Sequence, residues 1–138
     1  GQVLSKYFKH NLVPFGEFVP LRKYIPNVWE IGRFVRQYQD YSAGDGNAYM
    51  ELGHNITALP LVCYEAIFPS YVHRQKNETD VLLNITNDAW FKNTTAPYQH
   101  FAMARVRAVA AGKPMLRVAN MGVTVKVDKY GRIVLTSN

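Results

Sequence analysis

The alternation of short apolar runs with helical segments constrains the fold of this chain more than any other feature. Residues 56–63 end in the run ALPLVC, and residues 80–86 contain the run VLL, as expected of buried strands. Helical signals follow each run, over residues 66–76 and 98–111. The first helix begins at Ala66 or only near Pro69. This alternation predicts a layered α/β domain with a mixed sheet.

Further elements extend the pattern towards both ends of the chain. We expect strands at residues 3–9, 48–52 and 115–119, and a C-terminal hairpin of residues 123–128 and 132–136. Apolar residues at helical spacing predict a helix over residues 27–38. Gly112 and Pro114 should end the helix of residues 98–111. A chain of 138 residues has room for one domain with a real core.

Charge and motif content exclude several classes of function. The net charge is +6, but the basic residues form no run and no zinc-finger, RNP or helix-turn-helix motif. We therefore expect a solvated basic face and no nucleic-acid partner, while attraction to anionic lipid headgroups stays open. One cysteine and four unpaired histidines predict no metal site, and the absence of GxGxxG and P-loop motifs predicts no cofactor.

Cys63 is the first candidate site residue, within the motif Val62-Cys63-Tyr64-Glu65. It lies where a buried strand ends and a helix is about to begin. Such a turn exposes a side chain at the edge of the sheet, and the helix N-terminus would stabilise a thiolate. Free cysteines are also commonly buried as small apolar residues. The motif alone leaves both interpretations open.

Lys9 and Glu17 form a second candidate pair, around the rigid loop LVPFG. A lysine held beside a thiolate lowers the thiol pKa and can stabilise an oxyanion. Lys9 lies at the end of an expected strand, just before the loop, although a solvated lysine is the ordinary alternative. Glu17 would orient the lysine or cap a backbone amide.

A third group of candidates follows the second buried strand. Asn87 and Asp88 come directly after it, at the strand end where α/β proteins place their sites. Trp90 and Phe91 follow in the same loop and would wall a pocket or pack onto the core. We expect at least one of these two aromatic residues to have the packing role.

Five ordered blocks of sequence carry a resemblance to a known family. Together they resemble the nitrilase (carbon-nitrogen hydrolase) superfamily, and more narrowly its apolipoprotein N-acyltransferase branch. The blocks cover nearly the whole chain: KHNLVPFGEFVP at residues 9–20, CYE at 63–65, LNITNDAWF at 83–91, PYQHFAMARVRA at 97–108 and PMLRVANMGVT at 114–124.

The resemblance implies a fold, a site and a reaction. The implied fold is an αββα sandwich with mixed sheets, and Lys9 and Cys63 match the lysine and nucleophile of a Glu-Lys-Cys triad. Glu17, Tyr64 and Glu65 match positions that line the same site. In the implied reaction the thiolate takes an acyl group from a phospholipid and passes it to the N-terminal diacylglyceryl-cysteine of an apolipoprotein. Partners would include the membrane surface, on the periplasmic side of a bacterial inner membrane.

The same resemblance implies that residues 1–138 are the C-terminal portion of the catalytic domain. The triad glutamate and the membrane helices of the family lie outside this stretch, so we expect it to be inactive alone. Residues 20–41 would then form a mobile arm near the membrane, or an ordinary packed helix. Two other functions compete: a soluble amidase of the same superfamily, and a binding module in which Cys63 is merely buried.

Overall fold

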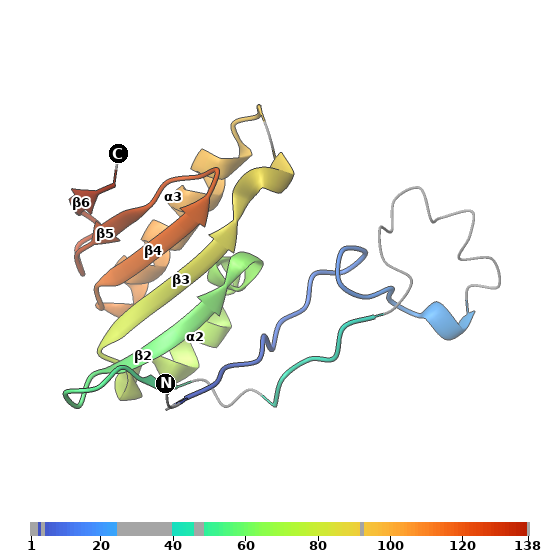
Figure 1. Ribbon diagram of the computed structural model, residues 1–138, viewed down its shortest axis with the longest axis horizontal. Helices are drawn as coiled ribbons and strands as arrows, with labels where there is room; N and C mark the ends of the chain where they lie inside the picture. Colours follow the sequence, from blue (N-terminus) through green and yellow to red (C-terminus); the bar gives the residue numbers. More distant parts are fainter. Residues whose placement is uncertain (1–2, 4, 25–39, 46–48, 92, 138) are drawn as a thin grey trace.

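The structure is a computed structural model that describes residues 3, 5–24, 40–45, 49–91 and 93–137. Within these residues six strands form one sheet in the order β1-β2-β3-β4-β5-β6 (Figure 1). The strands are β1 (Met50–Glu51), β2 (Thr57–Val62), β3 (Val81–Asn87), β4 (Met115–Asn120), β5 (Val125–Val127) and β6 (Ile133–Thr136).

The sheet is mixed, with parallel strands at its centre and antiparallel strands at both edges. β2, β3 and β4 run parallel, with Leu61 opposite Asn84 and Asn84 opposite Arg117. β1 pairs antiparallel with β2, and β5 and β6 close the other edge as an antiparallel hairpin. The predicted α/β class and mixed sheet are therefore confirmed.

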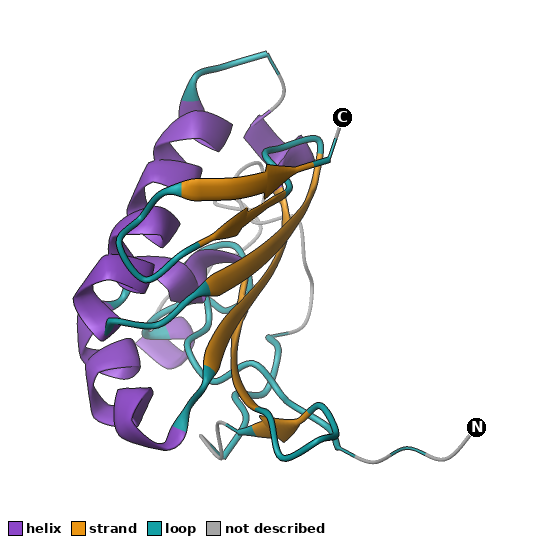
Figure 2. Cartoon of the chain, turned by 90° about the vertical axis from the view of Figure 1, so that its left-hand side faces the viewer, coloured by secondary structure: helices purple, strands orange, loops and turns teal. Residues whose placement is uncertain are grey.

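Two helices connect the parallel strands and cover one face of the sheet (Figure 2). α2 (Pro69–Gln75) lies between β2 and β3, and α3 (Ala96–Ala111) lies between β3 and β4. Parallel crossovers are almost always right-handed, so two crossovers that advance in the same direction put both helices on one side. α3 ends at Gly112, whose φ of 64° is the left-handed conformation of a glycine C-cap.

The core lies between this helical layer and the sheet. Alternate residues of the strands face the helices and are buried, because side chains of a strand point to opposite faces in turn. They pack against small residues of α3, which let the helix approach closely. The buried core cluster consists of Leu59, Leu61, Ala66, Tyr71, Val72, Leu82, Ala104, Ala108, Met115, Val125 and Val127. On the other face Ile85 and Val118 are 50% and 54% exposed. The described residues thus form one sheet and one helical layer of the expected αββα sandwich.

The N-terminal part of the chain differs from its prediction. The strand expected at residues 3–9 is wrong: the described part of that segment belongs to no strand and runs irregularly beside the sheet body (Figure 1). Its neighbouring amides, at His10 and Asn11, donate to a side-chain carboxylate rather than to a strand. A short 3-10 helix, η1 (Arg22–Tyr24), follows. The helix expected at residues 27–38 and most of the arm expected at 20–41 lie outside the described residues.

Candidate active site

Cys63 lies at the turn that follows β2, at the carboxyl end of the parallel strands. β2 ends at Val62, and Cys63 is the first residue of the 3-10 helix η2 (Cys63–Ile67). Its backbone φ is 53°, a left-handed conformation that costs a non-glycine residue free energy and is found at functional sites. Its thiol is free and partly exposed. The helix that begins at Cys63 is thus the short 3-10 helix η2, and the α-helix α2 begins only at Pro69.

Glu65 ties the N-terminal segment to this turn. Its carboxylate is fully buried, and it accepts hydrogen bonds from the amides of His10 at 2.8 Å and Asn11 at 2.9 Å. It also accepts from the Tyr7 hydroxyl at 2.9 Å and from the Val62 amide at 2.8 Å. The last bond is the one that a capping-box glutamate makes to the residue before its helix. One carboxylate thereby fixes residues 7–11 beside the turn that carries the candidate nucleophile.

Lys9 is held by Glu17 within the N-terminal segment. The Lys9 ammonium donates to both carboxylate oxygens of Glu17, at 2.6 and 2.7 Å. Glu17 also accepts from the amide of Val13 at 2.8 Å, which fixes the carboxylate on its own loop. The Gly44 amide donates to the Lys9 carbonyl at 2.8 Å. Glu17 therefore orients Lys9 and caps a backbone amide at once, which are the two roles considered for it from the sequence.

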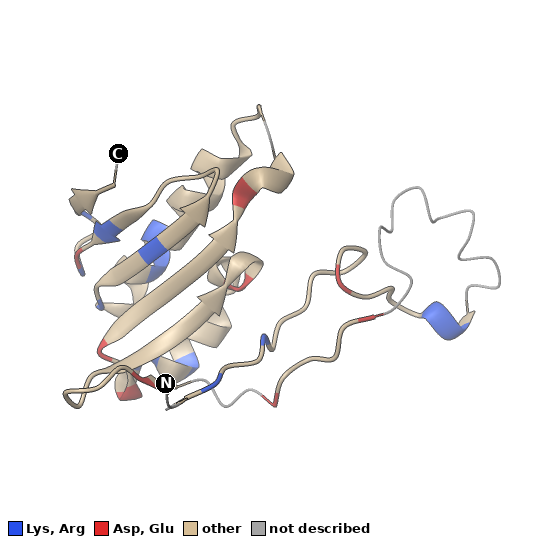
Figure 3. Cartoon of the chain, in the orientation of Figure 1, with Lys and Arg blue, Asp and Glu red and all other residues tan. Residues whose placement is uncertain are grey.

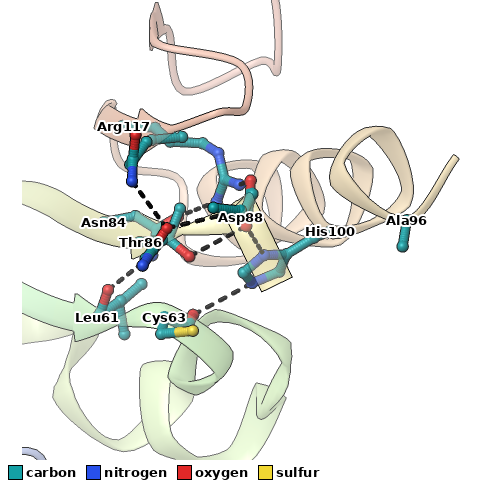
Figure 4. Close-up of polar contacts among 12 residues, drawn as sticks. Leu61, Cys63, Asn84, Thr86, Asp88, Ala96, His100 and Arg117 are labelled. Carbon is teal, nitrogen blue, oxygen red and sulfur yellow. Dashed lines mark hydrogen bonds and ion pairs between the residues drawn. The ribbon is translucent and has the colours of Figure 1, made fainter. Parts of the chain in front are cut away.

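A buried polar cluster lies on the other side of Cys63 (Figure 4). Asp88 and Arg117 are fully buried and form an ion pair of 2.7 Å. His100 Nδ1 lies 2.8 Å from Asp88 Oδ1, and His100 Nε2 lies 3.2 Å from the carbonyl oxygen of Cys63. A β-carbon at Gly122 would collide with the Asp88 carboxylate, so only glycine fits there. The cluster joins α3 and β4 to the backbone of the candidate nucleophile.

Asn84 extends this cluster across the sheet. Its side-chain amide donates to the Leu61 carbonyl on β2 at 2.6 Å, and its side-chain oxygen accepts from Arg117 on β4. Thr86, two residues on, donates to Asp88 at 3.1 Å. Three adjacent strands are thus bridged by polar side chains inside an otherwise apolar layer.

Burial shifts the pKa of Arg117 in the buried polar cluster and the pKa of Tyr7 beside Glu65. Burial lowers the pKa of the Arg117 guanidinium, and the neighbouring Asp88 carboxylate opposes that change. Burial also raises the pKa of the Tyr7 phenol, and the hydrogen bond with Tyr71 and the charge of Glu65 act in the same direction. Tyr7 therefore stays protonated and donates to Glu65 throughout the physiological range.

The remaining candidates lie at the surface. Tyr64 is 37% exposed, and its ring lies near those of Phe68 and His100. Asn87 is exposed at the end of β3 and accepts from the Ala89 amide and the Asn120 side chain. Trp90 is 65% exposed, so it does not fill the core. The structure thus gathers Cys63, Glu65 and Asp88 around the turn and leaves Asn87 and Trp90 on the outside.

Sequence reasoning missed His100, Arg117 and Asn84 as members of the site. The sequence did hold one signal: Asn84 and Arg117 occupy strand positions whose neighbours two residues away, Leu82 and Met115, are buried on the helical face. A polar or charged residue in such a register needs a buried partner. His100 gives no comparable signal, because its partners come from different elements.

Among the described residues, the Lys and Arg positions are spread over several separate elements of the chain (Figure 3). Among the described residues no group of three potential metal ligands lies together. None of the helices within the described ranges is both long and apolar enough to cross a bilayer.

Comparison with known sequences identifies relatives along the whole chain. The sequence profile of the carbon-nitrogen hydrolase family matches residues 1–137. The apolipoprotein N-acyltransferase of Rickettsia prowazekii is 44% identical over 135 residues, which are 98% of this chain and 26% of the relative. That of Rhizobium rhizogenes is 43% identical over 134 residues, 97% of this chain and 25% of the relative. The chain therefore spans about a quarter of the length of these relatives.

Solved structures share the fold at low sequence identity. A carbon-nitrogen hydrolase from Helicobacter pylori G27 matches with a TM-score of 0.58 and 13% identity, over 77% of this chain and 43% of that one. An amidase from Nesterenkonia sp. matches with a TM-score of 0.55 and 20% identity, over 72% of this chain and 40% of that one. Both likenesses concern the fold alone.

Proposed function

Because the chain belongs to the carbon-nitrogen hydrolase family, we propose that it is the C-terminal part of the catalytic domain of an apolipoprotein N-acyltransferase, with Cys63 as the nucleophile. The observation that carries the proposal is the backbone of Cys63. A free, partly exposed thiol sits at a left-handed residue directly after a buried parallel strand, where a side chain is presented at the sheet edge. The names of the relatives, which are 38–44% identical, supply the reaction class.

The proposed reaction has two steps through a thioester. The Cys63 thiolate attacks the carbonyl carbon of a phospholipid acyl ester, the carbon–oxygen ester bond breaks, and the released alkoxide takes a proton to give a lysophospholipid. The α-amine of a diacylglyceryl-cysteine then attacks the thioester carbonyl. The carbon–sulfur bond breaks, the amine loses a proton and the thiol is restored. Covalent catalysis of this kind replaces one difficult transfer by two easier ones.

Lys9 and Glu17 support this chemistry from the N-terminal segment. The Lys9 ammonium supplies a positive charge for the thiolate and for the oxyanion of each tetrahedral intermediate. Glu17 holds that ammonium by two short hydrogen bonds, so the charge is fixed before substrate arrives. Glu65 holds the segment of Lys9 against the turn of Cys63. Tyr64, Asn87, Asp88 and Trp90 line or frame the same edge of the sheet.

The partners and setting follow from the same proposal. The acyl donor is a phospholipid, the acceptor is an apolipoprotein, and the domain works at the periplasmic surface of a bacterial inner membrane. The triad glutamate belongs to sequence beyond these residues, so the 138-residue chain is inactive alone.

A transfer assay on the complete protein tests the proposal. The complete polypeptide would be mixed with phospholipid vesicles and a synthetic peptide that begins with diacylglyceryl-cysteine, and the peptide mass followed with time. We expect a gain of one acyl group, and no gain with Cys63→Ser. Release of ammonia from small amides, with no change in the peptide, would support an amidase instead. Inactivity in both assays together with an unreactive thiol would support a binding module.

A further inference from the structure

His100 has two hydrogen-bond partners, and neither can donate a proton to it. Nδ1 lies 2.8 Å from Asp88 Oδ1, and Nε2 lies 3.2 Å from the backbone carbonyl of Cys63. A carbonyl oxygen only accepts. The Asp88 carboxylate also acts as an acceptor, because its other oxygen is paired with the Arg117 guanidinium at 2.7 Å and Thr86 donates to Oδ1.

A neutral imidazole cannot satisfy both contacts. It carries one N–H, so one of its nitrogens would bring a lone pair against the lone pair of an acceptor. His100 is 5% exposed, and water cannot readily replace either partner. Only the imidazolium, which carries a proton on each nitrogen, donates to both Asp88 and Cys63.

The surroundings of His100 accommodate the positive charge. Asp88 faces the ring from η4 (Asp88–Phe91), and it is shared with Arg117 of β4. Tyr64 of η2 and Phe91 of η4 lie against the ring with centroid distances of 6.4 and 6.3 Å. The titratable groups that contact the ring are therefore Asp88 and Tyr64, and Arg117 is paired with the same Asp88 carboxylate.

We propose that His100, protonated on both ring nitrogens, is a positioning residue that holds the backbone of Cys63 through its carbonyl oxygen. The inference rests on the proposed role of Cys63 as nucleophile. The left-handed turn at Cys63 is strained and persists only when its surroundings fix it. The bond from Nε2 fixes the carbonyl on one side of the turn, and Glu65 fixes the Val62 amide on the other.

Two substitutions, each of which keeps the position of one ring nitrogen, separate the contacts. In His100→Asn the side-chain nitrogen replaces Nδ1 and keeps the bond to Asp88, but the donor to Cys63 is lost. In His100→Gln the side-chain nitrogen reaches the place of Nε2 and keeps the donor to Cys63. His54→Asn is a matched control, because His54 is exposed in the turn between β1 and β2, at the opposite end of β2 from Cys63.

The variants would be made in the complete protein, and two rates would be measured. These are kcat and KM for acyl transfer, and the rate of Cys63 alkylation by iodoacetamide from pH 6 to 10. For His100→Asn we expect kcat to fall about 10- to 100-fold at unchanged KM, with slower alkylation. His100→Gln should recover most of both losses, and His54→Asn should match the unmodified protein.

Equal rates in the Asn and Gln variants, or lower rates in the Gln variant, would overturn the proposal. Thermal melting of each variant identifies loss of folding. If the variants do not fold, nitrogen NMR of histidine-labelled unmodified protein decides: two protonated ring nitrogens at pH 7 support the proposal, and a single one overturns it. Alkylation and NMR need no acyl transfer, so failure of the proposed function alone leaves this test intact.

Discussion

The sheet body and the N-terminal segment of this molecule are held by different forces. The sheet body, residues 57–137, buries alternate apolar residues under two helices. The N-terminal segment, residues 5–24, contains no strand of the sheet and is attached by hydrogen bonds to the buried carboxylate of Glu65. Cys63 belongs to the first region and Lys9 to the second. The segment that carries Lys9 is therefore attached to the turn of Cys63 mainly by polar contacts with Glu65 and Tyr71.

The difference teaches where each region is vulnerable. Apolar burial is spread over many residues, so a sheet of this kind tolerates modest changes of shape. A segment attached through the Glu65 carboxylate and the Tyr71 side chain can detach while the sheet remains folded. We expect the position of Lys9 to be lost well before the fold is lost.

The largest expected effect lies inside the sheet body. Arg117→Met leaves the Asp88 charge buried without its guanidinium partner and leaves Asn84 without its donor. We expect a loss of about 3 kcal/mol in the free energy of unfolding, measured by denaturant titration of the complete protein. Arg132→Met is the matched control, because Arg132 pairs with Asp128 while 73% exposed. Equal, small effects of the two substitutions would show that the buried cluster does not stabilise the sheet.

A smaller and more local effect is expected at Glu65. Glu65→Gln puts an amide N–H against one of the backbone N–H groups that now donate to the carboxylate, at a cost of about 1–3 kcal/mol. Hydrogen exchange should become at least roughly tenfold faster at the His10 and Asn11 amides, while the Leu82 amide in β3 is unchanged. Tyr7→Phe removes one donor and should cost only about 1 kcal/mol. Faster exchange at Leu82 as well would mean that the two regions unfold together.

The smallest effect concerns the far end of the N-terminal segment. Asp40 accepts two hydrogen bonds from Arg22, and these, above other causes, lower the pKa of its carboxyl group. A folded-state pKa below the unfolded value stabilises the fold above the unfolded pKa. That contribution is lost as the pH falls through the folded pKa. Acid should therefore lower the protection of the Val19 amide, which also donates to Asp40, when its exchange rate is compared with the intrinsic rate at the same pH. Asp40→Asn should remove the pH dependence, and high salt should weaken it.

The same contrast explains what could be predicted from the sequence. Periodicity predicted the strands and helices of the sheet body, because each depends on a local pattern of apolar residues. It failed at residues 3–9, where alternation predicted a strand but no neighbouring strand pairs with the segment. Cys63, Lys9 and Glu17 were predicted as site residues from their motifs, and that role remains a prediction. His100 and Arg117 were not, because their significance depends on partners that only the fold brings together.

The central claim is that Cys63 forms a thioester, and trapping that adduct tests it most directly. The complete protein would be incubated with phospholipid in the absence of an acceptor, and its intact mass measured beside that of a Cys63→Ser variant. We predict a gain of one acyl chain that maps to Cys63, disappears with hydroxylamine and is absent from the variant. A thiol that reacts readily with iodoacetamide but gains no acyl chain would contradict the account.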